Sequence, residues 1–158
     1  MSEPTVADAP EPASVDVLVT EVIRRPVEVV AAYANDPSNA PEWYANISSV
    51  EWKTPPPVGV GSEVAFVATF LGRELRYTYA IVERTAQSLV MRTAEGPFPM
   101  ETTYRYEALP DGSTRMSLRN RGNPSGFSKV AAPLMRFAMK RATSADLRAL
   151  KAILERES

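Results

Sequence analysis

The chain has 158 residues, of which 44% are hydrophobic and 23% charged, ordinary values for one soluble globular domain. The formal net charge is −1, so no overall field attracts nucleic acid or an anionic membrane surface. The sequence contains no Cys and no His, which excludes disulfides, thiol nucleophiles, the serine-histidine-aspartate relay and zinc sites built from either residue.

The first fourteen residues, MSEPTVADAPEPAS, contain three acidic residues, three prolines and no basic residue, a composition typical of a disordered, solvated tail. A secretory signal needs a basic start followed by an apolar stretch, and neither is present. No apolar run approaches the ~20 residues that a membrane-spanning helix needs. We therefore predict a disordered tail over 1–14, a single domain over 15–158 and a cytoplasmic protein without a membrane span.

The first elements of the domain follow from alternation and from proline positions. Apolar and polar residues alternate from Val15 to Arg24, which predicts a strand with one buried face. Pro26 and the pair Asp36-Pro37 then supply the residues that open helices, so two short helices are expected, the second ending towards Trp43. A further strand is expected near Ile47–Lys53.

The next two strands, Val64–Phe70 and Leu75–Ile81, are expected to form a hairpin. The first strand is apolar at even-numbered residues and the second at odd-numbered residues. Both apolar sets face the core only if each residue pairs across the hairpin with one of the other parity, so that the two residue numbers add up to an odd number. A two-residue Gly72-Arg73 turn meets this condition, and glycine in first place is typical of a type II′ turn. This turn places Phe66 opposite Tyr79.

A strand at Ser88–Thr93 precedes a second hairpin, whose inward residues are expected to be Thr102, Tyr104, Tyr106, Met116, Leu118 and Asn120. In this hairpin the residue numbers of each cross-strand pair must add up to an even number, because the inward residues of both strands are even-numbered. A three-residue Pro110-Asp111-Gly112 turn meets this condition. The resulting register sets Glu107 against Arg115 and Glu101 against Arg121 on the outer face, opposite charges in both pairs.

A long helix is expected from Ser125 or Ser128 to about Glu155. Its apolar residues at helical spacing are Val130, Leu134, Phe137, Leu147, Leu150 and Leu154. At 1.5 Å per residue such a helix is roughly 42 Å long and crosses a small domain. Pro133 either kinks it or marks where the regular helix begins.

This order of elements is the helix-grip arrangement, and the segments that match it are IRRPVEVV at 23–30, Asp36 before Trp43, DGSTR at 111–115 and the final helix. Over about residues 15–155 the sequence resembles the polyketide cyclase/dehydrase-like branch of the START and birch-pollen-allergen superfamily. The resemblance implies an α+β fold, in which a curved antiparallel sheet of six or seven strands wraps around the C-terminal helix. It also implies that a lipid, polyketide or other apolar molecule binds between sheet and helix; some members are cyclases or aromatases.

The predicted inward face is either a filled core or the wall of a cavity. Each buried phenol needs a hydrogen-bond partner, at a cost of ~1–3 kcal/mol when it lacks one. Four tyrosines with Thr93, Thr102 and Asn120 on one concave face favour a cavity that holds water or a ligand. The predicted cavity residues are Phe66, Phe70, Tyr77, Tyr79, Met91, Tyr104, Tyr106, Met116, Leu118, Asn120, Leu134, Ala138 and Arg141.

Several of these roles have an alternative. The helix alanines either leave room for a ligand or are simply good helix formers. Arg141 either faces the ligand or extends its stem to water. Trp43 either lines the mouth or anchors the short helices, and the apolar loop over 96–100, with Phe98, is either a gate or an inert turn. Trp43 and Phe98 are the mouth candidates, and no metal site is expected.

Three functions are consistent with the sequence. The first is binding of a small hydrophobic or aromatic molecule. The second is a cyclase, aromatase or dehydratase, in which a tyrosine donates a proton and Arg141 stabilises an oxyanion. No inward carboxylate is expected, because Glu74, Glu101 and Glu107 alternate with the inward-facing residues of their strands and therefore face outward. The lack of a carboxylate that could act as a base favours binding over catalysis.

The third function is docking on a partner through the last helix, where residues 127–158 carry seven basic and three acidic residues. A solvated outer face is the ordinary explanation of such a charge excess. No cofactor and no nucleic acid partner are expected, and a homodimer is left open.

Overall fold

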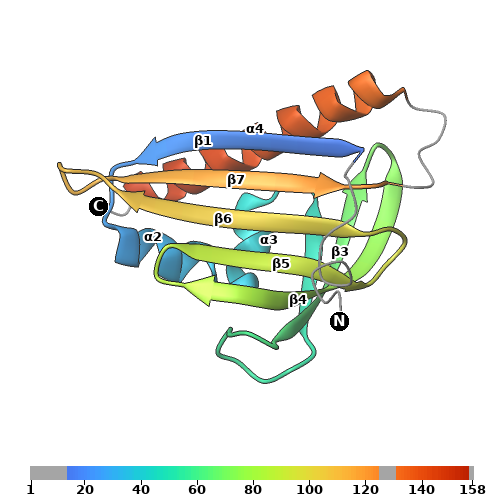
Figure 1. The fold of residues 1–158 in the computed structure, drawn as a ribbon, viewed down its shortest axis with the longest axis horizontal. Coiled ribbons are helices and arrows are strands. Elements are labelled where there is room, and N and C mark those ends of the chain that lie inside the picture. The colour runs from blue at the N-terminus through green and yellow to red at the C-terminus, as the bar shows by residue number, and fades with distance from the viewer. Residues whose placement is uncertain (1–13, 125–130, 157–158) are drawn as a thin grey trace, which may run out of the picture.

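The computed structural model describes residues 14–124 and 131–156, so the predictions for residues 1–13 of the tail and for a helix start at 125–130, Val130 included, lie outside the described residues. One curved antiparallel sheet of seven strands lies in front of a single long helix, with the short helices on the same side as that helix (Figure 1). The elements are β1 (Val15–Ile23), α2 (Val27–Ala34), the 3-10 turn η1 (Pro37–Asn39), α3 (Ala40–Trp43), β2 (Ile47–Trp52), β3 (Glu63–Phe70), β4 (Arg73–Thr85), β5 (Ser88–Glu95), β6 (Met100–Ala108), β7 (Thr114–Gly122) and α4 (Ala132–Arg156).

The strand order is β1-β7-β6-β5-β4-β3-β2, so the first strand of the chain pairs with the last one. This arrangement confirms the helix-grip fold with two short helical segments after the first strand. The Asp36 side chain accepts a hydrogen bond from the Ser38 N–H at 3.0 Å and caps η1, as its position before Pro37 predicted. None of the helices within 14–124 and 131–156 is long and apolar enough to cross a membrane.

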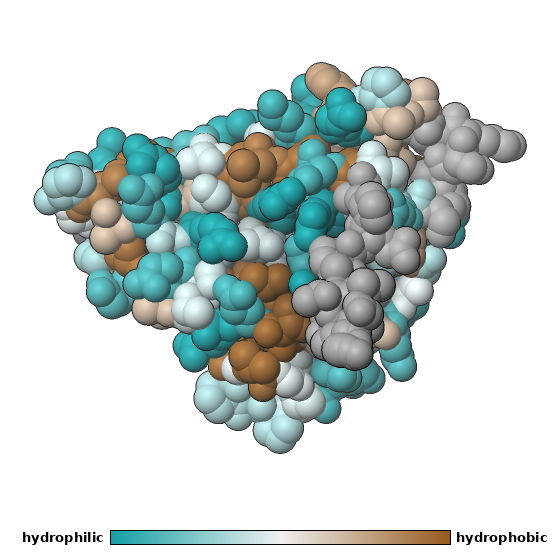
Figure 2. Space-filling view, in the orientation of Figure 1, coloured by the Kyte–Doolittle hydropathy of each residue, from teal (hydrophilic) through white to brown (hydrophobic). Residues whose placement is uncertain are grey.

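The outer face of the sheet carries paired charges. Glu101 accepts hydrogen bonds from Arg92 at 2.7 Å and from Arg121 at 2.9 Å, which ties three neighbouring strands together. Arg119 forms a two-pronged contact with Asp16 on β1. Figure 2 shows this face, where hydrophilic side chains cover part of the sheet and a hydrophobic patch lies beside them. The apolar residues of these strands therefore point to the concave side, toward α4.

The β6–β7 hairpin has the predicted register. Glu107 lies opposite Arg115, with 2.9 Å between carboxylate and guanidinium, and Glu101 lies opposite Arg121. The turn closes through a 2.9 Å hydrogen bond from the Leu109 N–H to the Ser113 carbonyl. Gly112 has φ = 89°, the left-handed conformation expected at the third turn residue. Turn chemistry and alternation therefore predicted this register correctly.

The predicted β3–β4 register is wrong by two residues. Phe66 lies opposite Tyr77 instead of Tyr79, and the turn is Leu71-Gly72 instead of Gly72-Arg73. Both turn residues have positive φ, 50° for Leu71 and 78° for Gly72, which is the type I′ geometry. The observed pairing of the two strands is shifted by two residues from the predicted pairing. Because a shift by two keeps each side chain on the same face, the inward and outward faces of both strands are still those predicted.

The helix α4 begins at Ala132, with Pro133 in its first turn, so the alternative that the regular helix starts near Pro133 is confirmed. The prediction that Leu134 and Phe137 belong to its buried stripe is wrong, because they are 59% and 62% exposed. They precede Leu150 by about 4.4 and 3.6 helical turns, which places them near the opposite side of the helix. The buried face consists of Met135, Met139, Thr143, Asp146, Leu147, Leu150 and Leu154.

Replacement of Leu71 in the β3–β4 turn tests the energetic cost of its left-handed backbone. Leu71→Asn is expected to raise the free energy of unfolding by about 0.5–1 kcal/mol, because asparagine tolerates positive φ and leucine does not. Urea denaturation measures this gain. The control Leu18→Asn, on the exposed face of β1, should lower stability or leave it unchanged, because asparagine is disfavoured in strands. A loss of stability in Leu71→Asn would contradict the explanation.

Candidate functional site

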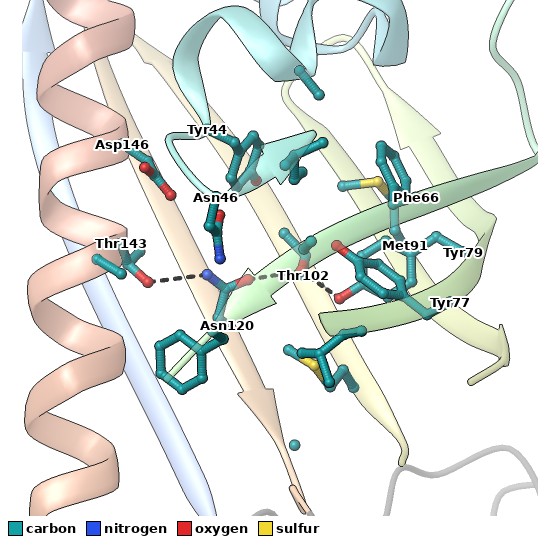
Figure 3. Close-up of a pocket in the computed structure, with 18 of the residues that line it drawn as sticks. Tyr44, Asn46, Phe66, Tyr77, Tyr79, Met91, Thr102, Asn120, Thr143 and Asp146 are labelled. Carbon is teal, nitrogen blue, oxygen red and sulfur yellow. Dashed lines mark hydrogen bonds between the residues drawn. The ribbon is translucent and has the colours of Figure 1, made fainter. Parts of the chain in front are cut away.

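A cavity of about 120 Å³ lies between the concave face of the sheet, the short helices and α4 (Figure 3). Eight of the predicted cavity and mouth residues are in its wall: Phe66, Phe70, Tyr77, Tyr79, Met91, Phe98, Tyr104 and Asn120. Seven of the eight come from strands, where alternation alone decides which side chains face inward. Whether these residues bind a ligand remains a prediction.

Three predicted cavity residues lie in the core instead of the wall. Met116 and Leu118 on β7 are fully buried and contribute to the main hydrophobic cluster. The Tyr106 hydroxyl donates a 2.6 Å hydrogen bond to the Asn35 side-chain oxygen, at the junction of β6 with the C-terminal end of α2. Alternation placed these side chains on the correct face, but it does not tell which part of that face α2 and α4 cover.

The helix residues of the prediction do not line the cavity. Leu134 and Arg141 are exposed and Ala138 is half-buried outside the wall. The reason is the phase of α4, since Arg141 precedes Leu150 by about 2.5 turns and therefore points away from the sheet. The helix residues in the wall are Met135, Met139, Ala142, Thr143 and Asp146.

Trp43 is a packing anchor and not a mouth residue. It is 2% exposed, and its ring centroid lies 4.2 Å from that of Tyr44 and 5.7 Å from that of Tyr104. Its neighbour Tyr44 reaches the cavity wall in its place. Phe98, the other mouth candidate, is buried in the wall beside Met100. The gate and the inert turn remain alternatives for the loop over 96–100.

A chain of hydrogen bonds crosses the cavity from the sheet to α4 (Figure 3). The Thr102 hydroxyl on β6 donates to the Asn120 side-chain oxygen at 2.7 Å and lies 2.8 Å from the Tyr79 hydroxyl, which must therefore be the donor to Thr102. The Asn120 amide then donates to the Thr143 hydroxyl at 3.1 Å. These four polar groups satisfy one another and fix the distance between β6, β7 and the middle of α4.

The remaining phenols keep hydrogen-bonding capacity that faces the cavity. The Tyr44 and Tyr104 hydroxyls lie 2.7 Å apart, a contact that uses only one of their two hydrogens. The Tyr77 hydroxyl has no hydrogen-bond partner among the described residues. Burial raises the pKa of Tyr77, Tyr44 and Tyr104 well above the usual value, and it raises the pKa of Tyr79 to about 12. Near neutral pH these groups are therefore neutral donors.

The expectation that no carboxylate faces inward is wrong, because Asp146 on α4 lines the cavity and is 5% exposed. One of its oxygens accepts a 3.1 Å hydrogen bond from the Ala45 N–H. Burial raises its pKa from 3.8 to about 6, an effect that the Ala45 hydrogen bond partly opposes. The alternation of side chains in strands says nothing about residues of a helix. Helical spacing was the signal for Asp146, since it follows Met139 by seven residues and precedes Leu150 by four.

Among the described residues no three acidic side chains are close enough to hold a metal ion. The chemistry of the wall therefore consists of one carboxylate, amides, several phenols and hydroxyls, and apolar side chains. Such a wall can orient an apolar molecule through a few hydrogen bonds and can exchange a proton at Asp146.

Comparison with known proteins identifies the family. The profile of the family described as "Polyketide cyclase / dehydrase and lipid transport" matches residues 14–155. The chain belongs to this family. None of the curated proteins that were compared with the chain matches it in sequence.

Solved structures share its fold. The protein TTHA0849 from Thermus thermophilus superposes with a TM-score of 0.77 at 19% identity, over 90% of this chain and 99% of the other. A START superfamily protein from Mycobacterium smegmatis gives 0.77 at 15% identity over 90% and 99%. The Zhui aromatase/cyclase from Streptomyces sp. R1128 gives 0.72 at 19% identity over 89% and 93%. At these identities the likeness extends to the fold alone.

The raised pKa of Asp146 predicts a specific dependence of stability on pH. A neutral Asp146 carboxyl is favoured by the fold, so this stabilisation is complete below about pH 4 and is lost as the pH rises through about 6. Asp146→Asn keeps the acceptor for Ala45 and should be more stable than the native protein at pH 7, by on the order of 2–3 kcal/mol, with little difference at pH 3.5. Urea denaturation at several pH values measures this.

Asp16→Asn is the matched control, because the hydrogen bond from Arg119 lowers the pKa of Asp16. Its removal should therefore cost more stability at neutral pH than at acid pH, the opposite sign. Equal stability of Asp146→Asn and the native protein across the range would show that Asp146 is not desolvated.

Proposed function

We propose that the protein binds a small molecule with an apolar, aromatic body in the cavity between sheet and α4. The observation that carries this proposal is the set of polar groups with spare hydrogen-bonding capacity in a largely apolar wall, namely the Tyr77 hydroxyl, one hydrogen of the Tyr44/Tyr104 pair and one oxygen of Asp146. In a dry, filled core a buried polar group without a partner, such as the Tyr77 hydroxyl, costs ~1–3 kcal/mol. A ligand with one or two polar atoms satisfies such groups while its body fills the apolar space.

The cavity volume indicates the size of the molecule. An apolar protein cavity of about 150 Å³ accommodates benzene. A volume of about 120 Å³ is therefore slightly smaller than a benzene-sized cavity in the conformation described, and a two-ring molecule, a polyketide or a lipid requires the wall to open. Met91, Met100, Met135 and Met139 make such adjustment easy, because methionine side chains repack readily.

The relatives are consistent with this class of ligand. The family description names lipid transport together with polyketide cyclases and dehydrases, and one structural neighbour is an aromatase/cyclase. These activities concern largely apolar molecules.

Blocking the cavity tests the proposed binding. Naphthalene is expected to bind the native protein and to raise its melting temperature, because a ligand that binds only the folded state stabilises it. Ala142→Leu, which adds a side chain in the wall, should weaken binding by at least about tenfold. The control Ala138→Leu lies one turn earlier on α4 and outside the wall, and it should change the affinity by less than about twofold.

Isothermal titration calorimetry gives both affinities, and the melting temperatures of the two variants without ligand show that they are folded. Equal affinity of Ala142→Leu and the native protein would place the ligand elsewhere. No binding of naphthalene, indole or 2-naphthol to the native protein would overturn the proposed function.

A second candidate function is favoured by Asp146. A general base works best with a pKa near the operating pH, and the Asp146 pKa of about 6 meets this condition. For an enolisable ketone in the cavity, Asp146 would take the proton from the carbon beside the carbonyl, and a neutral tyrosine hydroxyl would donate a hydrogen bond to the developing enolate oxygen. This is the proton transfer that cyclisation and dehydration both require.

Deuterium exchange detects this step without knowledge of the natural substrate. In D₂O, 2-tetralone should exchange the protons beside its carbonyl at least about tenfold faster with the protein than in buffer, with a rate that rises through about pH 6. Asp146→Asn should abolish the acceleration, whereas Asp16→Asn on the outer face should retain it. Exchange at the buffer rate while 2-tetralone is bound would exclude this function. Proton NMR measures the rate.

The docking function of the C-terminal helix and the homodimer remain predictions. Two of the charges counted for the docking function act within the domain, since Lys151 contacts both Glu155 at 2.7 Å and the Val22 carbonyl at 2.6 Å. Arg136, Lys140, Arg141 and Arg148 are exposed along α4. Their arrangement is what a solvated helix face shows, so we advance no partner.

A further inference from the structure

We infer that the cavity selects molecules that carry a hydrogen-bond donor on an apolar body, and that the second oxygen of Asp146 accepts the hydrogen bond from that donor. The inference rests on the proposed binding function and specifies the chemical class of its ligand. It follows from the distribution of polar groups along the cavity and from the hydrogen atoms that these groups already use.

The cavity has an apolar end and a polar end. Met135 and Met139 precede Asp146 by eleven and seven residues, about three and two turns on the same face of α4, or roughly 16 and 10 Å along its axis. Met135 and Met139 pack with Leu75 and Phe98 in one hydrophobic cluster. The axis of α4 therefore leads from this apolar cluster to the carboxylate, and an elongated ligand can bridge the two ends.

The polar end contains an acceptor without a matching donor. The Ala45 N–H occupies one oxygen of Asp146, and no described residue donates to the other. The phenol hydrogens nearby are partly committed, that of Tyr79 to Thr102 and one of the Tyr44/Tyr104 pair to the other member. In Figure 3 Tyr44, Asn46 and Asp146 lie around the same space at the corner between α3, β2 and α4.

The charge state of Asp146 decides which ligand group it accepts. A carboxylate accepts hydrogen bonds and cannot donate them, and a hydrogen bond to a charged group contributes about twice as much as a neutral one. With a pKa of about 6 Asp146 is mostly ionised near neutral pH, and burial leaves it poorly solvated. A hydroxyl or ammonium group of the ligand supplies the missing donor, whereas an ether or ketone oxygen beside it would be repelled.

The other ionisable groups around this corner do not compensate the carboxylate. Tyr44 next to α3, Tyr77 on β4 and Tyr104 on β6 interact with Asp146 electrostatically, and burial keeps all three phenols neutral over the relevant range, because it raises the pKa of each. Glu21, a half-buried residue of β1, is acidic, and β1 is the strand that packs along α4. Arg141 and Arg148 are on the exposed side of α4. The uncommitted donors around this corner, namely the Tyr77 hydroxyl, one hydrogen of the Tyr44/Tyr104 pair and the Asn46 amide, make no hydrogen bond to Asp146 among the described residues, so its second oxygen is open to a ligand donor.

Three naphthalene compounds separate the possibilities. Naphthalene has no polar group, 2-methoxynaphthalene has an acceptor only, and 2-naphthol has a donor. At pH 7.5 the native protein should bind 2-naphthol about tenfold more tightly than either of the others, the difference expected of one hydrogen bond to a buried carboxylate. In Asp146→Asn the preference should fall to about twofold, because a neutral amide oxygen is the weaker acceptor.

The pH provides an independent readout. The preference of the native protein for 2-naphthol should decline between pH 7.5 and pH 5, as Asp146 takes up a proton, whereas that of Asp146→Asn should be constant. A fourth compound, 2-(aminomethyl)naphthalene, carries a cationic donor. Tighter binding of this amine than of 2-naphthol would assign the site to ammonium ligands, and the reverse order to hydroxyl ligands; both orders support the inference.

The inference and the proposed function can fail separately. Equal affinities of the native protein for naphthalene and 2-naphthol, or an unchanged preference in Asp146→Asn, would overturn the inference and leave the binding function intact. If none of the four compounds binds the native protein, both are overturned. A near-UV circular dichroism spectrum identical to that of the native protein would show that Asp146→Asn retains its packed aromatic residues.

Discussion

The attachment of α4 to the sheet at one end is the constraint on which the rest of the structure depends. Leu147, Leu150 and Leu154 are essentially fully buried and fill the space beneath this end. Hydrogen bonds to the chain around β1 hold the same end, from the Arg25 guanidinium to the Leu154 carbonyl at 2.6 Å and from Lys151 to the Val22 carbonyl at 2.6 Å. The other half of the helix faces the sheet with two methionines, an alanine and a threonine, and the cavity is the space that these side chains leave.

The position of Asp146 at the boundary between these halves has an energetic consequence. A buried carboxylate with one backbone hydrogen bond is destabilising compared with a neutral residue of the same shape. The leucines of the anchored end and the chain of hydrogen bonds from Tyr79 to Thr143 hold the helix in place despite that cost. Residues that reduce stability without a structural benefit are typical of functional sites.

The success of the sequence-based prediction depended on which periodicity was used. In the strands, side chains alternate with a period of two, so even the wrong β3–β4 turn, shifted by two residues, kept Phe66, Tyr77 and Tyr79 on the concave face. The β6–β7 turn was predicted fully because only a three-residue turn preserved the parity of both strands. The type I′ turn with Leu71 at φ = 50° was not predictable from preferences, since leucine is disfavoured there.

In the helix, a small error in the angular position of the buried stripe around the axis grows with the number of residues over which the stripe is extended. Leu134 and Phe137 have helical spacing between themselves, but the gap of ten residues before Leu147 does not continue that stripe. A helix traced backwards from Leu150 through Leu147, Asp146, Thr143, Met139 and Met135 gives the observed face. An apolar pattern does not include the polar residues of that face, Thr143 and Asp146, so it does not predict the carboxylate of the cavity.

The two chemical roles considered for Asp146 make opposite demands on its proton affinity. A ligand that donates a hydrogen bond stabilises the ionised carboxylate and lowers its pKa below 6, which makes it a weaker base. A ketone that excludes water without donating a hydrogen bond deepens the desolvation, raises the pKa and makes the carboxylate a stronger base. A donor-bearing molecule is therefore bound best in the state in which catalysis is least favoured, so the direction of the ligand-induced pKa shift distinguishes a binding protein from an enzyme at the same residue.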